Sequence, residues 1–317
     1  MSSVQQHASF SLYAGPQMFI GAQALDHLPY LLHQHRISRP TVLHAPDREG
    51  SSLMKSVADV FEECGTDFLS ASYRKNAVSI DQQTDALISL GSVPARAAHQ
   101  LSADAGLPLA LVLTDIQHCT EAGNIYTGVF PDYLFLDPSA YPQRVPELTA
   151  RTAIAALTLL TESLQQDRAH DLSCCYAEAG LGRLQAAAGE PIRSLQARHA
   201  AAEAAVNAAL VRSNTGAGTV SSVCQALSSS GFTYPSEAAA VLLPLLLAQT
   251  DQHDSRFLSS AGGSGEILRL LGIFVQSAGF PPRADQILAL AKSTAELSHQ
   301  RHGRDILRLF DTAGAGS

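Results

Sequence analysis

One loop of this 317-residue chain holds four side chains that suit acid–base and nucleophilic chemistry: Asp115, His118, Cys119 and Glu121. Histidine and carboxylate groups transfer protons, and a cysteine beside a histidine can become a nucleophile. We predict that this loop contacts a ligand. His118 and Glu121 would act as acid or base, Cys119 as a further nucleophile and Asp115 as a substrate contact. A polar surface turn is the alternative.

The elements that must position this loop alternate between short apolar runs and helical patterns. The runs are Thr41–Ala45, Phe68–Tyr73, Ala86–Gly91, Leu109–Thr114 and Tyr133–Asp137. The helical patterns around and between them are Ala24–His35, Ser51–Cys64, Ile80–Asp85 and Pro94–Ala105. This alternation is typical of a doubly wound parallel sheet, and continuous rather than alternating runs indicate that both faces are covered.

After Pro146 only helical patterns continue. They are Glu147–Leu164, Asp171–Ala188, Ser194–Arg212, Val220–Ser229, Ser236–Ala248, Gly265–Ser277, Ala284–Leu297 and His302–Phe310. We therefore expect an α/β domain over residues 1–145, resembling a degenerate nucleotide-binding domain, and an all-helical domain over residues 146–317. In such an arrangement ligands bind in the cleft at the carboxyl ends of the strands, where the Asp115–Glu121 loop begins.

Other polar side chains lie near the same expected cleft. Tyr234 and Glu237 flank the start of a predicted helix and are further acid–base or substrate-contact residues. Three side chains could hold an anionic substrate: Tyr126, Tyr141 and Arg144. We therefore expect a small-molecule substrate.

Composition excludes several classes of partner. The net charge of −8 argues against nucleic acid and anionic membranes as main partners. The longest apolar stretch, Ala238–Ala248, is too short to span a membrane and contains Pro244. The N-terminus has no secretory signal pattern, and the cysteine count of 5 is odd with no Cys-x-x-Cys pair. We expect reduced thiols in the cytoplasm.

Several segments, in this order, resemble the iron-containing alcohol dehydrogenases, and in particular their maleylacetate reductase branch. "FSLYAGPQMFIGAQALDHLP" is similar to the opening hairpin of that family, with Gly21 at the turn before the first helix. "FPDYLFLDPSAYPQRVPELTA" carries Asp137-Pro138 and then Pro146-x-Leu148-Thr149, and "FTYPSEAAAVLLP" is similar to a Pro-His-Gly segment and its helix. The resemblance implies the family's two-domain fold and a homodimer.

The same resemblance implies that this chain is a degenerate member without the metal ligands. The family places an Asp or Asn, a His four residues later, and two more His at the catalytic cleft. The matching positions here are Ala155, Leu159, Ser222 and Ser236. Alanine and leucine have no donor atom and neutral hydroxyls are poor ligands, so we expect no metal. Ser222, Ser236 and the family's retained glutamate, Glu162, become substrate-contact predictions; a structural hydrogen bond is the alternative for Glu162.

The cofactor loop also departs from the family. A pyrophosphate needs glycines and free N–H groups at a helix start, and the turn here reads Gly91-Ser92-Val93-Pro94. The family's lysine on this helix aligns with Gln100, and most of its second glycine-rich turn is missing from Gln117–Glu121. We therefore expect no bound cofactor.

Three functions remain open from the sequence. The first is an enzyme that is not a conventional dehydrogenase. It would use the metal-free cleft for non-redox elimination, isomerisation, cyclisation or condensation of a small organic substrate in specialised metabolism. The second is a catalytically silent partner subunit or ligand-binding scaffold. The third is a metal-independent reductase that binds a nicotinamide cofactor through a changed loop.

Overall fold

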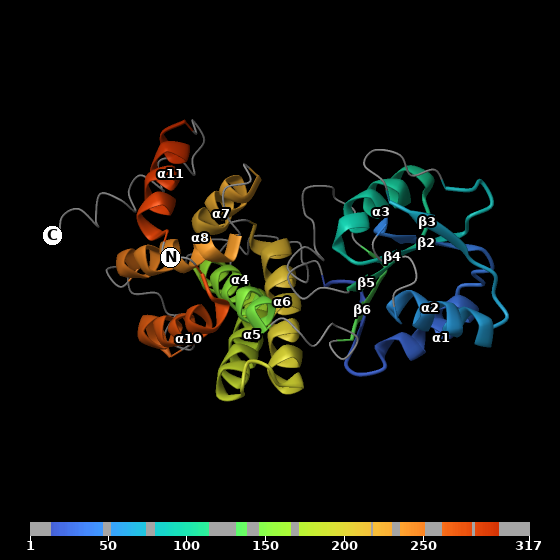
Figure 1. Ribbon diagram of the computed structural model, residues 1–317, viewed down its shortest axis with the longest axis horizontal. Coiled ribbons are helices and arrows are strands. Elements are labelled where there is room, and N and C mark those ends of the chain that lie inside the picture. Colours follow the sequence, from blue (N-terminus) through green and yellow to red (C-terminus); the bar gives the residue numbers. More distant parts are fainter. Residues whose placement is uncertain are drawn as a thin grey trace, which may run out of the picture.

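The computed structural model describes residues 14–46, 52–73, 80–113, 131–137, 146–165, 171–216, 218–229, 235–250, 262–280 and 283–297. Figure 1 shows a sheet with its own helices at one end of the molecule and a group of helices at the other. No described helix is both long and apolar enough to cross a membrane.

The sheet has six strands in the order β1-β6-β5-β4-β2-β3. Their bounds are Gln17–Ile20 (β1), Pro40–His44 (β2), Leu69–Ser72 (β3), Ala86–Leu90 (β4), Leu109–Leu113 (β5) and Tyr133–Leu136 (β6). Every pair is parallel. The chain runs from β2 outward to β3 and then back to β4, so the order reverses between β2 and β4. This reversal is the position where doubly wound sheets usually bind ligands.

Helices cover both faces of the sheet. A 3-10 turn at Ala24–His27 (η1) leads into α1 (Leu28–Gln34), and these pack with α2 (Ser52–Glu63) on one face. α3 (Ser92–Ala105) contributes Ala98 to the core on the opposite face. Residues of one strand alternate between the two cores: Val42 belongs to the first and Leu43 to the second. This alternation explains the continuous apolar runs of the sequence, because both faces of each central strand are buried.

The second part of the chain is helical. Its helices are α4 (Pro146–Leu164), α5 (Asp171–Gly189), α6 (Leu195–Thr215), α7 (Thr219–Ser229), α8 (Pro235–Thr250), α10 (Gly263–Ala278) and α11 (Ala284–Leu297). α4 is central: it packs against α5, α6, α7, α8 and α10, and most of its side chains are buried. The core around α4 is continuous with the sheet face that carries Leu43 and Leu111.

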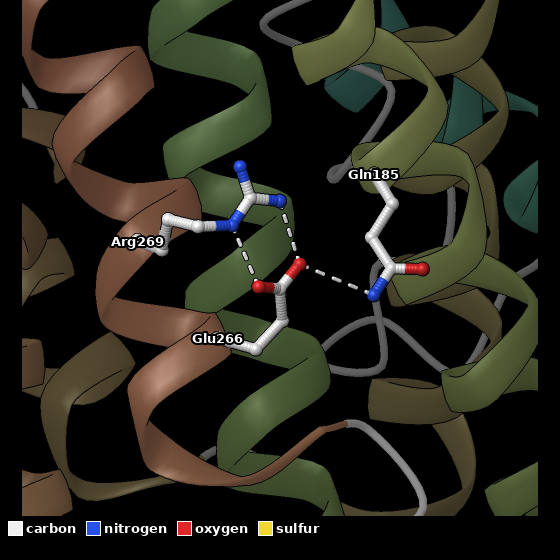
Figure 2. Close-up of polar contacts among 3 residues, drawn as sticks. All are labelled: Gln185, Glu266 and Arg269. Atoms are coloured by element: carbon white, nitrogen blue, oxygen red, sulfur yellow. Dashed lines mark hydrogen bonds and ion pairs between the residues drawn. The ribbon is translucent and has the colours of Figure 1, made fainter.

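At the exposed surface, α5 and α10 are also joined by polar contacts. Glu266 receives hydrogen bonds from Arg269 on its own helix, at 2.6 and 2.7 Å, and from Gln185 of α5 at 3.3 Å (Figure 2). The Arg269 guanidinium lowers the pKa of Glu266. Because these groups are solvent-exposed, they add specificity to the α5–α10 contact more than stability.

The fold class expected from the sequence, a doubly wound parallel sheet followed by an all-helical part, is confirmed. One predicted element is wrong. Ile80–Asp85 is a turn rather than a helix, because the Asp81 carboxylate accepts the Gln83 N–H at 2.8 Å and the Thr84 N–H bonds to the Asp81 carbonyl. An aspartate that bonds the backbone two residues ahead favours a turn. The predicted boundary at residue 145 and the helix His302–Phe310 lie outside the described residues.

Candidate functional site

Much of the predicted acid–base set lies outside the part of the chain that the structure describes. These residues are Asp115, His118, Cys119, Glu121, Tyr126, Tyr141, Arg144 and Tyr234. They follow strands β5 and β6 or precede helix α8 in the sequence, and their roles stay predictions. Four predicted site residues are described: Glu162, Ser222, Ser236 and Glu237.

Three helices bring these four residues into one region. Glu162 lies on α4, Ser222 on α7, and Ser236 with Glu237 on the first turn of α8. Each of these helices packs against the other two. Ser236 is buried, and the Ser222 hydroxyl is half-buried and donates to the Gly218 carbonyl at 2.7 Å.

Glu162 is buried, and its carboxylate binds the first turn of α7. The Val220 N–H donates to Oε1 at 2.5 Å and the Ser221 N–H donates to Oε2 at 3.0 Å. The first N–H groups of a helix have no partner within the helix, and a carboxylate there also interacts favourably with the helix dipole. Glu162 of α4 therefore caps α7, which matches the structural alternative considered from the sequence. A substrate contact by Glu162 stays untested.

Burial dominates the ionisation of this carboxyl group. Desolvation raises the pKa of Glu162 to about 7, although hydrogen bonds from Ser221 and Val220 and the positive charge of Arg212 act in the opposite direction. Burial also raises the pKa of the neighbouring Cys224 thiol, and the Glu162 charge adds to that shift. A carboxyl group with a pKa near 7 is half ionised at neutral pH, so its charge responds to small changes in pH.

Glu237 is also buried, with its side chain 3% exposed, and it forms an ion pair with Arg283. Arg283 Nε lies 3.4 Å from Glu237 Oε1, and the arginine side chain is 39% exposed. Arg283 precedes α11, so this pair joins the starts of α8 and α11. A buried carboxylate that already faces an arginine suits a role in holding that arginine more than a role as a free base.

Sequence reasoning missed Gly218 and Arg283. A Cβ added to Gly218 would lie 2.5 and 2.6 Å from the two Glu162 oxygens, so only glycine leaves room for this cap. The two glycines of the "GAG" sequence directly before this helix are a sequence signal for a close backbone approach. No local signal pairs Arg283 with Glu237, because 45 intervening residues separate them in the sequence.

Comparison with solved structures identifies the architecture. A 1,3-propanediol oxidoreductase superposes with a TM-score of 0.78 at 16% identity, covering 96% of this chain and 100% of that chain. Maleylacetate reductase from Rhizobium sp. strain MTP-10005 gives 0.73 at 16% identity, covering 96% and 97%. The iron-containing alcohol dehydrogenase from Thermococcus thioreducens gives 0.76 at 15% identity, covering 97% and 100%. The chain has the fold of the iron-containing alcohol dehydrogenases.

At this level of identity the likeness establishes the fold and not the reaction. No protein-family model matches the chain, and no curated protein matches it. The function of this chain therefore has to be inferred from its own residues.

The side chains at the implied metal positions do not fit a divalent metal. Ala155 is partly buried and Leu159 is buried, and neither carries a donor atom. The Ser222 hydroxyl is already bonded to the backbone, and Ser236 is a neutral hydroxyl. Within the described ranges, no three His, Cys, Asp or Glu side chains come together in a way that could hold a metal ion. Iron and zinc prefer imidazole, carboxylate or thiolate ligands, which this set lacks.

The start of α3 offers a reduced cradle for a nucleotide. Gly91 has a φ of 90° and precedes the helix, but its N–H donates to the Val112 carbonyl at 2.8 Å. Pro94 lies in the first turn of α3 and has no N–H. Fewer backbone donors therefore face the position where the dehydrogenase-like fold would place a pyrophosphate.

Proposed function

We propose that the protein is an enzyme that uses the site between its sheet and helices α4, α7 and α8 for metal-free, non-redox acid–base chemistry on a small organic substrate. The observation that carries this proposal is the chemistry of the implied metal positions. Ala155, Leu159, Ser222 and Ser236 provide no ligand set, while the same helices bury two carboxyl groups, Glu162 and Glu237.

Burying these carboxyl groups supports an enzyme over a silent scaffold. Burying an ionised carboxyl group costs about several kcal/mol of desolvation free energy, roughly as much as its interactions with buried partners gain. Glu162 and Glu237 also have structural partners, but active sites commonly contain buried carboxyl groups with shifted pKa values. The raised pKa of Glu162 fits this pattern.

The reaction class follows from what the remaining predicted residues can do. Elimination, isomerisation and condensation commonly begin with the removal of a proton from a carbon next to a carbonyl group, which needs a base and a binding site for the carbonyl compound. His118 and Glu121 are the proposed acid–base residues, with Tyr234 as a further acid–base candidate, Cys119 as a nucleophile, and Glu237 holding Arg283. A keto acid is the proposed substrate class, consistent with the maleylacetate reductases that share the fold.

Solvent deuterium exchange tests this proposal without knowledge of the natural substrate. The protein, dialysed against EDTA, is incubated in D2O with a panel of small keto acids, and proton NMR follows the loss of the C–H signal next to the carbonyl. We expect protein-dependent exchange without NADH or NADPH. His118→Gln should slow it by about 10²- to 10⁴-fold, the usual contribution of a general base.

His33→Gln is the matched control, because His33 is an exposed histidine on α1 and should leave the exchange rate unchanged. Exchange that requires added iron or zinc would contradict the proposal. Turnover that requires NADH or NADPH would instead establish the reductase. No exchange with any acid, together with a fixed protein partner, would establish the silent scaffold.

A further inference from the structure

A serine and a histidine are hydrogen-bonded near the carboxyl ends of β2 and β3. His44 ends β2 and is buried, with 1% of its surface exposed. Its Nε2 lies 2.9 Å from the Oγ of Ser70 on β3, and its Nδ1 lies 2.9 Å from the carbonyl oxygen of Ala45. Ser70 is exposed, so its hydroxyl is the part of this pair that solvent reaches.

The bond to Ala45 decides which nitrogen of the His44 ring carries the proton. A carbonyl oxygen only accepts hydrogen bonds, so Nδ1 is the donor and carries it. In the neutral ring Nε2 then holds a lone pair, and the Ser70 hydroxyl donates to it. A nucleophile that donates to a base, with the base oriented by a third group, is the arrangement used in nucleophilic catalysis. Here the third group is the Ala45 carbonyl.

The register of β2 and β3 places this pair on one face at the edge of the sheet. Val42 of β2 belongs to the core under α1 and α2, and His44, two residues later, lies on the same face. Ser70 is opposite Val42 in the register, and Ser72 is opposite His44. The Tyr73 N–H donates to the His44 carbonyl at 2.7 Å, which holds the end of β3 in this register. β3 is the outermost strand of the described sheet, next to β2 (Figure 1).

Ser72 adds a second hydroxyl on the same face of β3. Its Oγ is buried and has no hydrogen-bond partner among the residues that the structure describes. A buried polar atom without a partner costs about 1–3 kcal/mol, and an oxygen atom of a ligand would remove that cost. The Ser72 hydroxyl can therefore donate to the oxygen of a molecule that binds beside Ser70 and His44.

We propose that Ser70 and His44 form a second reactive site, in which Ser70 takes the acyl group of an activated oxygen ester or thioester. Ser70 Oγ forms a bond to the acyl carbon, and the bond from that carbon to the leaving oxygen or sulfur breaks. The Ser70 proton passes to Nε2 of His44 and then to the leaving group, so the step needs no oxidant or reductant. This site shares no residue with the site proposed above and does not rest on the proposed function.

Acetylation by 4-nitrophenyl acetate tests this site in the complete protein, with peptide mass spectrometry locating the acetyl group in acid-quenched samples. Ser293 is the matched control, because it is exposed and its hydroxyl donates at 2.9 Å to the Leu290 carbonyl, which does not act as a base. We expect Ser70 to be acetylated at least about 10²-fold faster than Ser293, the lower end of what a general base contributes. Unfolding in guanidinium chloride should remove this difference, because it separates Ser70 from His44.

Two substitutions separate the roles of the pair. His44→Gln should slow acetylation of Ser70 by about 10²- to 10⁴-fold and leave Ser293 unchanged, because an amide does not take up the proton. If acetyl-Ser70 is hydrolysed rapidly, the site shows itself as continuous release of nitrophenolate, and Ser70→Ala should abolish that release.

Equal acetylation of Ser70 and Ser293 in the folded, unmodified protein, without release of nitrophenolate that depends on Ser70, would overturn the proposal. Unchanged acetylation of Ser70 in a folded His44→Gln protein would do the same. The first comparison needs no substitution at the buried histidine, so it decides the question even where His44→Gln does not fold. No keto acid is used, so the outcome is independent of the deuterium-exchange assay.

Discussion

Three glutamates show how the surroundings of a carboxyl group set its interaction partners and its pKa. Glu266 is on the surface beside Arg269, and the arginine lowers its pKa. Glu162 is buried against backbone N–H groups, and desolvation raises its pKa. Glu237 is buried beside Arg283. Only the first arrangement could be expected from the sequence, because Glu266 and Arg269 are three residues apart on one helix, whereas the other two depend on distant segments.

Buried hydroxyl groups on α4 provide a test at the same scale. Thr161 Oγ1 donates to the Leu157 carbonyl at 2.7 Å, whereas Thr152 Oγ1 is buried with no hydrogen-bond partner among the described residues. A buried polar atom without a partner costs about 1–3 kcal/mol, and valine has nearly the same shape as threonine. Thr152→Val should therefore leave the free energy of unfolding unchanged or raise it by up to about 2 kcal/mol.

The matched variant, Thr161→Val, should lower the free energy of unfolding by about 1 kcal/mol, because it removes a formed hydrogen bond at an equally buried position. Urea denaturation of both variants, with the slope of the transition checked for equality, measures the difference. Equal losses in both variants would show that the Thr152 hydroxyl is hydrogen-bonded in solution.

At the scale of elements, two glycines in α5 let the effect of close helix packing be measured apart from the effect of helix propensity. A Cβ at Gly180 would lie 2.8 Å from both Leu160 methyl carbons and 3.2 Å from the Asn207 Cβ, so α5 lies close to α4 and α6 at this point. A Cβ at Gly182 would meet nothing within 4 Å. Alanine is the better helix former by about 0.8–1 kcal/mol, so the two positions should respond with opposite sign.

Gly182→Ala should stabilise the protein by about 0.5–1 kcal/mol, and Gly180→Ala should destabilise it by about 1–3 kcal/mol through overpacking. Thermal unfolding followed by far-UV circular dichroism compares the two directly. Stabilisation by Gly180→Ala would mean that Leu160 moves aside at little cost, and that the close approach of α5 to α4 is loose.

Elements were predictable from the sequence wherever burial alone sets the pattern. The central strands β2, β4 and β5 lie within one residue of their apolar runs, because both faces are covered and each run is continuous. Ile80–Asp85 was wrong, because the short side-chain bond of Asp81 decides that segment. The capping of α7 by Glu162 was not predictable, because it needs the packing of α4 on α7, which no local pattern encodes.

At the scale of the whole molecule, the segment before β1 reaches from the sheet to the helical part. Gly15 has a φ of 94°, and a Cβ there would lie 2.5 Å from a methyl carbon of Leu210 on α6. β1 follows directly and pairs with β6, so this contact ties the edge of the sheet to the longest described helix. The core that surrounds α4 continues onto the sheet in the same way. The two parts should therefore unfold together.

Gly15→Ala tests that coupling. The substitution adds backbone strain of about 1–3 kcal/mol at a positive φ and also a clash with Leu210. Gly21→Ala is the control for strain alone, because Gly21 has a φ of 134° and an added Cβ would meet nothing within 4 Å. We expect Gly15→Ala to lower the free energy of unfolding more than Gly21→Ala, and Leu210→Ala to return part of the difference in a double-mutant cycle, with a coupling of about 0.5–3 kcal/mol. If the sheet and the helices then unfold in two separate transitions, the Gly15 contact is what joins them. If the coupling is zero while the transition stays single, the continuous core around α4 joins the two parts without it.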